Sequence, residues 1–294
     1  MIFPIDLKFN GKILTNAFLA PYTSFKIGGK VDYLVFPYTW NDVFLILEWA
    51  KKEGIPFKIM GQGSNILVPD EKMSGIVIKI NRNLGKIKRI SEEYLEVEAG
   101  CLLSDLLSFL MKNNLGGLEF LVGIPGNIGG SVFGNSGAFG NSIGEFVKEV
   151  VVIDENLNLK ILKNSDLFFS YRKSNIKEEY IIKSVLLKVN KQSKEKTYNL
   201  LLKYLRERQK RIPKFPSAGS IFKNPPNVSA GYLLEKVGMK GKRVGNVMVS
   251  HEHANIIINL GGGKAKEVKE LINIMKDKVK DHFNVDLDLE IKIW

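Results

Sequence analysis

The densest run of glycine in the chain lies at residues 123–140, which read "GIPGNIGGSVFGNSGAFG" with seven glycines in eighteen positions. Each ordered glycine costs conformational entropy, so this density needs a physical reason. A backbone stripped of side chains lets a flat or phosphorylated ligand approach the main chain, where N–H groups bind phosphate without lysine. We therefore predict a ligand contact here, with a glycine-lined packing contact as the alternative.

A second glycine-rich stretch, "GQGSN" at residues 61–65, follows a predicted strand. The next residues, "ILVPDEKMSG", contain a proline and a turn where a dinucleotide-binding fingerprint would begin a helix, which argues against a Rossmann site. Gly61, Gly63, Ser64 and Asn65 can still form a turn whose N–H groups converge on an anion. A plain tight turn explains the pattern equally well.

Two further segments carry polar residues with chemical potential. "SYRKS" (170–174) contains Arg172, whose planar guanidinium suits a carboxylate or phosphate, although a surface arginine is the commoner outcome. "SAGSIFKNPP" (217–226) places Ser220 among small residues before the chain turns at "KNPP". Such a segment can present Ser220 to a pocket, but a serine in this setting is usually a structural turn residue.

The sequence gives little support to metal or hydrolase chemistry. His251 and His253 are spaced to share one face of a predicted strand, but no cysteine or third histidine clusters with them, so we predict no metal site. No G-x-S-x-G elbow is present, which argues against a Ser-His-Asp hydrolase. The single cysteine, Cys101, excludes an internal disulfide and is predicted to be a small core residue in a reducing cytosol.

The chain carries a net charge of 43 − 31 = +12, which favours anionic partners. Residues 188–214 hold ten basic and two acidic residues; Leu201, Leu202 and Leu205 form one apolar stripe, so a solvated helix is favoured over a nucleic-acid patch. The N-terminus lacks signal-peptide order, and no apolar run approaches the roughly 18 residues that span a bilayer. We expect a cytoplasmic protein without membrane or nucleic-acid partners.

Strands and helices that position these segments are predicted from periodicity. A β-α-β unit comprises a strand at 31–37, a helix within 40–54 that Asn41 can cap, and a strand at 56–60. Further strands or hairpin arms are predicted at 75–80, 85–90, 94–99, 145–154, 157–162 and 180–189, with a helix at about 102–113.

The polar stretch at 190–197 is the predicted domain boundary, because helices dominate beyond it. They are predicted at about 197–211, at 229–237 with Ser229 as the cap, and at 264–283. The last helix has a single apolar stripe formed by Val268, Leu271, Ile272, Met275, Val279 and Phe283.

Seven segments, taken in order, resemble the UDP-N-acetylenolpyruvoylglucosamine reductase (MurB) family of bacterial cell-wall synthesis: "TSFKIGG", "GQGSNILV", "GIPGNIGGSVFGNSGAFG", "SYRKS", "SAGSIFKNP", "HANIIIN" and "VDLDLEIKI". The likeness runs from about residue 20 to 292. It implies an α+β fold, in which an FAD-binding domain of the vanillyl-alcohol-oxidase (PCMH) type precedes a smaller α+β substrate-binding domain. The implied divisions are 1–80 and 81–193 for the two FAD-binding subdomains, and 194–294 for the substrate domain.

The resemblance also implies the chemistry: NADPH reduces FAD, and the reduced flavin reduces the enolpyruvyl group of UDP-N-acetylglucosamine enolpyruvate. It assigns the flavin to both glycine-rich segments, namely to Gly61, Gly63, Ser64, Asn65, Gly123, Pro125, Gly126, Asn127, Gly129, Gly130, Ser131, Gly137 and Ala138. Ser220 matches the family's proton donor, Arg172 the arginine that holds the substrate carboxylate, and Glu290 the catalytic glutamate. Tyr171, Lys223 and Asn224 are expected to contact substrate.

Three departures from the family pattern keep charge or bulk: Lys26 stands where arginine is frequent, Phe133 where methionine is common, and Phe139 where tyrosine is common. Only "KSNIKEEY" separates Arg172 from the strand at 180, which resembles the shorter branch without an inserted loop over the substrate. That loop's tyrosine is therefore not carried over. Two alternatives remain at this point: another flavin oxidoreductase of the same fold, or a nucleic-acid-binding protein that uses residues 188–214 but leaves the glycines unexplained.

Overall fold

The computed structural model describes residues 8–210 and 212–294, and its contacts divide them into two units. Unit 1 holds residues 8–15, 33–62 and 75–206, and unit 2 holds residues 16–32, 63–74, 207–210 and 212–294. The first seven residues of the predicted first domain and the predicted helix end at residue 211 lie outside the described residues. Each unit mixes helices with sheets, as expected for an α+β fold.

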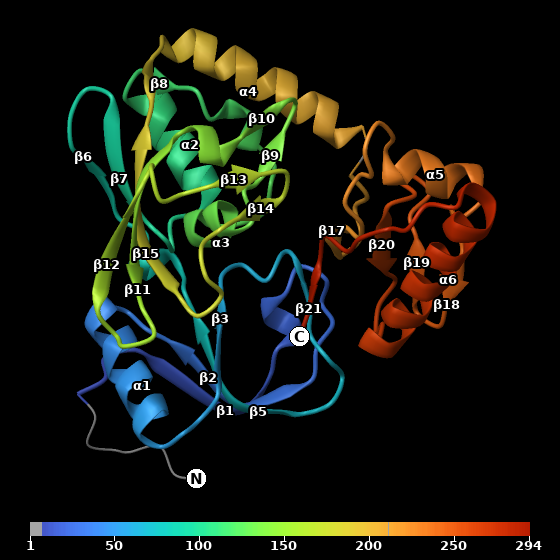
Figure 1. Cartoon of the computed structure of the whole chain (residues 1–294), viewed down its shortest axis with the longest axis horizontal. Coiled ribbons are helices and arrows are strands. Elements are labelled where there is room, and N and C mark those ends of the chain that lie inside the picture. The colour runs from blue at the N-terminus through green and yellow to red at the C-terminus, as the bar shows by residue number, and fades with distance from the viewer. Residues whose placement is uncertain (1–7, 211) are drawn as a thin grey trace. The chain divides into compact units, whose positions relative to one another are not determined.

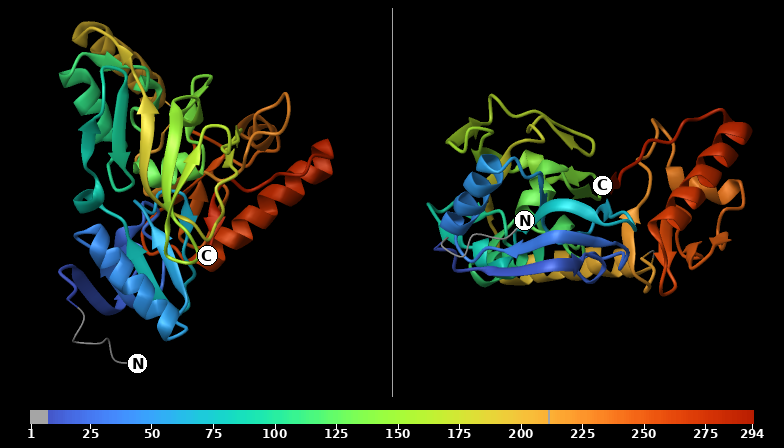
Figure 2. Two further views of the ribbon diagram at one scale, coloured as in Figure 1. Left: turned by 60° about the vertical axis from the view of Figure 1, so that its left-hand side comes forward. Right: turned by 90° about the horizontal axis from the view of Figure 1, so that it is seen from below.

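The sheet nearest the N-terminus in sequence has the order β1-β2-β5-β3, and its strands are Lys12–Phe18, Lys30–Phe36, Met73–Lys79 and Phe57–Met60. Strands β3 and β5 are parallel neighbours. Helix α1 (Trp40–Lys52) lies against this sheet (Figure 2). Within unit 1, its buried residues Val43, Ile46 and Leu47 belong to the same core as Ile76 and Ile78 of β5. The predicted β-α-β unit is thus present, with β5 inserted between its two strands.

The cap of α1 differs from the predicted one. Thr39 is the N-cap: its hydroxyl accepts a hydrogen bond from the Asp42 N–H at 3.1 Å, and the Asp42 carboxylate accepts one from the Thr39 N–H at 2.8 Å. Asn41 lies inside the helix. A threonine followed three residues later by a carboxylate forms a reciprocal capping box, which satisfies two backbone N–H groups where a lone asparagine would satisfy one.

A second sheet of unit 1 is antiparallel and has the order β12-β11-β15-β7-β6 (Figure 1). Its strands are Leu159–Lys163, Val147–Ile153, Ile181–Lys188, Tyr94–Glu98 and Ile87–Arg89, which confirms both predicted hairpins. Helix α2 (Leu103–Lys112) and helix α3 (Ile128–Phe133) bury leucine, isoleucine and valine side chains in the core of this unit. Helix α3 lies against β7 and β15.

Short strand pairs complete unit 1: β9 (Gly137–Ala138) with β10 (Asn141–Ser142), β13 (Phe169–Ser170) with β14 (Lys173–Ser174), and β8 (Leu115–Gly116) with β16 (Asn190–Lys191). Helix α4 (Lys194–Gln209) begins three residues before the predicted start. Leu201 and Tyr204 pack against the unit 1 core, and Tyr204 stacks on Phe139 with ring centroids 4.5 Å apart. The basic segment is therefore a helix with one packed face.

Unit 2 has an antiparallel sheet of order β17-β20-β19-β18, formed by Ser217–Ser220, Ile256–Asn259, Val247–Val249 and Arg243–Val244. Helices α5 (Ala230–Lys236) and α6 (Ala265–Phe283) pack on each other, and α6 contacts β18 and β19 (Figure 1). The predicted α6 stripe is confirmed, since five of its residues are buried and Phe283 packs at the edge of the core. Ser229 caps α5 as predicted. β4 (Ile66–Leu67) pairs in parallel with β21 (Lys292–Ile293).

None of the helices in the described part of the chain is long and apolar enough to cross a membrane.

Candidate functional site

The two glycine-rich segments meet in unit 1 at the carboxyl ends of β3 and β5. The Asn127 side chain donates to the carbonyl oxygen of Ile80, just after β5, at 3.2 Å and accepts from the Gly130 N–H at 3.2 Å. A Cβ on Gly61, just after β3, would come within 2.5 Å of the same Asn127 side chain. A Cβ at position 61 would have to displace the Asn127 side chain, which its two hydrogen bonds hold in place, so Asn127 links the two segments.

Backbone donors at this edge are available to a ligand. The N–H groups of Gly61, Gln62, Gly126 and Asn127 donate to no other described residue. Ligands of α/β sheets bind beyond the carboxyl ends of parallel strands, and adjacent N–H groups in a turn form a concavity for an anion. The residues present therefore fit the phosphate-bearing part of a dinucleotide such as FAD.

Part of residues 123–140 is helical and part of its backbone is already bonded, so the segment is not one continuous bare surface. Residues 128–133 are helix α3, and the N–H groups of Ile128 and Gly129 donate to Cys101 and Ala99. A Cβ on Gly129 would lie 3.0 Å from that of Ala99, and one on Gly137 would lie 2.5 Å from the Asn141 carbonyl oxygen. These two glycines thus serve close packing, because neighbouring chain segments approach them on the side where a Cβ would lie.

Other predicted flavin-contacting residues lie around α3. Gly123, with φ +74°, and Pro125 belong to the loop before it, Ser131 is buried on the helix, and Ala138 follows on β9. A Cβ on Gly130 would have only the Asn127 side chain near it, at 3.3 Å. Of the predicted contacts Gly129, Gly130 and Gly137, Gly130 is therefore the one whose open side fits a ligand contact.

Three hydrogen bonds join the "SYRKS" hairpin, β13–β14, to residues 133–137 of the glycine-rich segment. The Arg172 guanidinium donates to the Gly137 carbonyl oxygen at 2.8 Å, the Asn135 amide donates to Ser170 at 2.7 Å, and the Ser174 hydroxyl donates to Phe133 at 2.7 Å. Arg172 has φ +56°, a left-handed conformation that costs energy for an arginine. The hairpin therefore holds Arg172 beside the glycine-rich segment at the expense of local strain.

In unit 2, the rest of "GQGSN" packs on "TSFKIGG". Gly63 has φ +66°, and a Cβ there would lie 2.7 Å from the Tyr22 carbonyl oxygen. The Ser24 N–H donates to Gly63, and the Ser24 hydroxyl donates to the Ser217 carbonyl oxygen at 2.7 Å. Ser64 and Asn65 follow this turn, and the Asn65 side chain donates to the Glu290 carbonyl oxygen at 3.0 Å. This turn is thereby joined to the segment of Glu290 as well as to the strand of Ser220.

The structure brings the segments of Ser220 and Glu290 together. The Glu290 N–H donates to the Ile221 carbonyl oxygen at 2.8 Å, and the Lys223 N–H donates to that of Asp288 at 2.8 Å. Ile221 and Ile291 are buried, whereas Ser220 and Glu290 remain partly exposed, so both polar side chains point away from the unit 2 core. Arg172 belongs to unit 1.

The three predicted substrate contacts have different environments. Tyr171 is exposed in the hairpin, where its ring lies 5.4 Å from the Arg172 guanidinium. The Asn224 side chain accepts from the Ala230 N–H at 3.1 Å, which organises the turn before α5. Lys223 is half-buried beside it.

The sequence analysis missed three residues that bond to the segments of the site: Lys79, whose ammonium group donates to the Gly61 carbonyl oxygen, Asn135 and Asn255. The Asn255 side chain accepts from the Phe222 N–H at 3.0 Å and donates to its carbonyl oxygen at 2.8 Å, which fixes the segment that follows Ser220. For Lys79 a signal existed, because it is the one charged residue in the apolar strand "GIVIKI". Nothing in the sequence marked Asn135 or Asn255, because the residues to which their side chains bond are distant along the chain.

Other candidate sites have structural explanations. His251 and His253 lie in the loop between β19 and β20, which corrects the predicted strand face, and the His253 Nδ1 accepts from the Asn255 N–H at 3.1 Å. Among the described residues, no group of three or more metal-ligating side chains comes together. Burial, reinforced by the Asp105 charge, raises the pKa of the Cys101 thiol to about 12, so Cys101 is a protonated core residue, as predicted.

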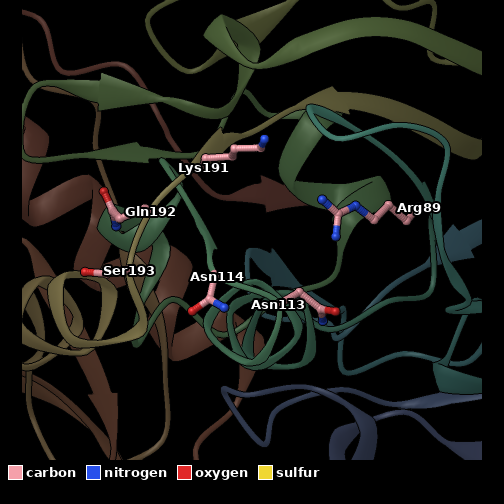
Figure 3. A pocket seen from close by; sticks show the side chains of 6 residues that line it. All are labelled: Arg89, Asn113, Asn114, Lys191, Gln192 and Ser193. Atoms are coloured by element: carbon pink, nitrogen blue, oxygen red, sulfur yellow. The ribbon is translucent and has the colours of Figure 1, made fainter.

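A hollow of about 410 Å³ on unit 1 is separate from the predicted site residues (Figure 3). It is lined by Arg89, Asn113, Asn114, Lys191, Gln192 and Ser193. Lys191 pairs with Glu92 at 2.6 Å, and the Gln192 side chain donates to Glu119 and Thr197. This ion pair and these hydrogen bonds hold the residues just before α4 in place.

Comparison with known proteins agrees with this geometry. Residues 31–157 match an FAD-binding domain, and residues 210–294 match the C-terminal domain of UDP-N-acetylenolpyruvoylglucosamine reductase. The UDP-N-acetylenolpyruvoylglucosamine reductase of Thermotoga maritima is 42% identical over 94% of this chain and 96% of its own. That of Caldicellulosiruptor saccharolyticus is 39% identical over 97% of this chain and 93% of its own. The crystal structure of the Thermus caldophilus enzyme matches with a TM-score of 0.83 at 32% identity, covering 97% of this chain and 99% of that one.

Together with these matches, the fold and the two glycine-rich segments identify an FAD-binding oxidoreductase of the α+β class. The chain belongs to the UDP-N-acetylenolpyruvoylglucosamine reductase (MurB) family. Both the resemblance drawn from the sequence and the fold class are thereby confirmed.

Proposed function

We propose that this protein is a UDP-N-acetylmuramate dehydrogenase, which reduces the enolpyruvyl group of UDP-N-acetylglucosamine enolpyruvate to a lactyl group for peptidoglycan precursor synthesis. The observation that carries the proposal is the set of available N–H groups where Gly61 and Asn127 meet at the carboxyl ends of β3 and β5. Relatives at about 40% identity over nearly the whole chain support the assignment.

The residues proposed to hold FAD are those of the two glycine-rich segments. Within unit 1 the donors are the N–H groups of Gly61, Gln62, Gly126 and Asn127, and the resemblance assigns Gly63, Ser64 and Asn65 to the same cofactor. When bound, FAD supplies hydride transfer, taking a hydride from NADPH and giving one to the substrate. This chain must then hold the substrate carboxylate, stabilise charge and deliver a proton.

Arg172 is proposed to hold that carboxylate. Its left-handed backbone and its bond to the Gly137 carbonyl oxygen fix one side of the guanidinium, which has five N–H donors in all. Hydride addition to the enolpyruvyl carbon places negative charge beside the carboxylate. A fixed guanidinium stabilises that charge without reorganising during the reaction.

Ser220 is proposed as the proton donor to the resulting enolate. Its hydroxyl makes no hydrogen bond to any residue that the structure describes, so its proton is available. A serine hydroxyl is a weak acid, but an enolate is a strong base, and a positioned weak acid suffices. Glu290 lies on the adjoining segment and is proposed to polarise or protonate the enolpyruvyl group.

Tyr171, Lys223 and Asn224 are proposed to contact the rest of the substrate, and the division into 1–80, 81–193 and 194–294 is kept as a proposal for the domains. The basic surface would attract two anionic substrates, since both UDP-N-acetylglucosamine enolpyruvate and NADPH carry phosphate. We place the reaction in the cytoplasm, without nucleic-acid or membrane partners.

The test follows the flavin spectrum in anaerobic solution. Protein reconstituted with FAD should bleach on addition of NADPH, and UDP-N-acetylglucosamine enolpyruvate should restore the oxidised spectrum in stoichiometric amount. A protein that binds no FAD would contradict the proposal. Reoxidation by oxygen but not by this substrate would favour another oxidoreductase of the same fold.

A further inference from the structure

Lys79, the last residue of β5, is buried, with 8% of its surface exposed. Lysine is rarely buried to this degree, because removing an ammonium group from water is costly unless it is hydrogen-bonded or paired. Its ammonium group donates to the carbonyl oxygen of Gly61 at 2.5 Å. The mechanism described above does not use this residue.

The Gly61 carbonyl belongs to the same peptide group as the Gln62 N–H. A trans peptide is planar, so its C=O and N–H point in opposite directions. When Lys79 fixes the carbonyl on one side, the Gln62 N–H is fixed on the other. That N–H donates to no residue in the described ranges 8–210 and 212–294.

A cation on the carbonyl also changes the strength of the donor. Hydrogen bonds in a chain polarise one another, and a charged donor does so more strongly than a neutral one. Lys79 therefore draws electron density from the Gln62 N–H and makes it a better donor to an anion. The Asn127 side chain lies 2.5 Å from the position that a Cβ on Gly61 would take, so it also limits movement of this residue.

We propose that Lys79 is a positioning residue that orients and polarises the Gly61–Gln62 peptide, so that the Gln62 N–H binds the diphosphate of FAD. The inference rests on the proposed function for the identity of the ligand. A buried lysine of strand β5 thus takes part in dinucleotide recognition indirectly, through the Gln62 N–H.

The experiment compares Lys79→Met with Lys88→Met, using full-length protein freed of FAD and titrated with FAD. Methionine keeps the length of the lysine stem and removes the charge, and Lys88 is an exposed lysine on β6 that gives the same change in net charge. We expect Lys79→Met to weaken FAD binding about tenfold or more, with a melting temperature of the FAD-free protein within about 3 °C of wild type. Lys88→Met should bind FAD within about twofold of wild type.

The Gln62 amide proton provides a readout that a purely structural lysine would not affect. In ¹⁵N-labelled wild-type protein it should move downfield when FAD binds, and in Lys79→Met this movement should be lost. If Lys79→Met does not fold, a wild-type Gln62 amide that does not respond to FAD still overturns the inference.

Equal FAD affinity of Lys79→Met and Lys88→Met, or a wild-type Gln62 amide that does not respond to FAD, would overturn the inference while leaving the proposed function intact. Wild-type protein that binds no FAD would remove both.

Discussion

The Arg172 guanidinium donates to the carbonyl oxygen of Gly137 at 2.8 Å, across 35 positions of sequence. This bond joins the residue proposed to hold the substrate carboxylate to the segment proposed to hold the flavin. Arginine can make it while presenting its other N–H groups elsewhere, whereas lysine is a point charge without a planar fork.

Arg172→Lys should therefore separate the two half-reactions. We expect the rate of substrate reduction to fall about a hundredfold or more, because a fixed donor to the developing charge is lost. Flavin bleaching by NADPH should stay within about twofold of wild type. Stopped-flow absorbance of each half-reaction measures both rates, with Lys173→Ala in the same hairpin as the control. Equal losses in both half-reactions would show that Arg172 only maintains the fold.

Ser220→Ala should also act on the second half-reaction alone. Removing the hydroxyl proton should slow protonation of the product by about a hundredfold or more, with flavin reduction by NADPH nearly unchanged. Ser217→Ala on the same strand is the matched control, since only the Ser217 carbonyl oxygen is needed by Ser24. The proton-donor role would be refuted by a Ser220→Ala enzyme that reduces substrate at the wild-type rate.

Alanine substitutions at Gly130 and Gly137 should distinguish a glycine that contacts the ligand from a glycine that serves packing. Gly130 is helical and open, so Gly130→Ala should leave the fold as stable or up to about 1 kcal/mol more stable while lowering FAD affinity about tenfold. A Cβ at Gly137 would lie 2.5 Å from the Asn141 carbonyl oxygen, so Gly137→Ala should destabilise the fold by about 1–3 kcal/mol. Thermal unfolding without FAD and an FAD titration measure both effects. Undiminished FAD binding by Gly130→Ala would mean that this glycine does not face the flavin.

Cys101 should resist alkylation in the native protein. Burial, with a contribution from Asp105, raises the pKa of its thiol to about 12 from an ordinary value of 9.0. Because the folded pKa is the higher one, this contribution to stability is complete below pH 9 and is lost as pH rises toward 12. Iodoacetamide at pH 8 should label Cys101 only when urea unfolds the chain. Rapid native labelling would contradict the burial.

Asp42 should contribute to stability in a pH-dependent way. Burial alone would raise the pKa of Asp42, but hydrogen bonds from Asn10, Thr39 and Tyr38 outweigh it and lower the pKa below its ordinary value of 3.8. The contribution is therefore present above about pH 4 and lost as pH falls through the folded pKa. Asp42→Asn should cost about 1 kcal/mol at pH 7 and progressively less in acid. Urea unfolding between pH 3 and pH 7 measures this cost, with exposed Asp281→Asn as the control. A cost that does not change with pH would exclude the charge as its source.

Sequence reasoning succeeded where the cause of a structure is local. The Ser229 cap and the apolar stripe of α6 depend on residues three or four positions apart, and both were predictable. The order of the family's segments also located the residues proposed for chemistry.

What sequence reasoning missed depends on partners that are distant along the chain. The packing of Gly129 on Ala99, the contact of Gly61 with Asn127 and the bond from Lys79 to Gly61 exist only once the sheets have formed. The sequence predicted a ligand contact somewhere in residues 123–140, with packing as the alternative. It could not say which glycines serve which purpose, because glycine looks the same in sequence whether a ligand or another backbone approaches it.

Unit 2 is assembled from three separate stretches of chain, and this has a consequence for biosynthesis. The Asp70 carboxylate accepts hydrogen bonds from the N–H groups of Ala265 and Lys266, at the start of α6, and the Asn259 side chain donates to the Phe25 carbonyl oxygen. During translation, residues 16–32 and 63–74 are therefore made well before the partners with which they pack. A nascent chain stalled before α6 leaves these stretches exposed, so chaperone binding should be longest-lived at this stage of synthesis.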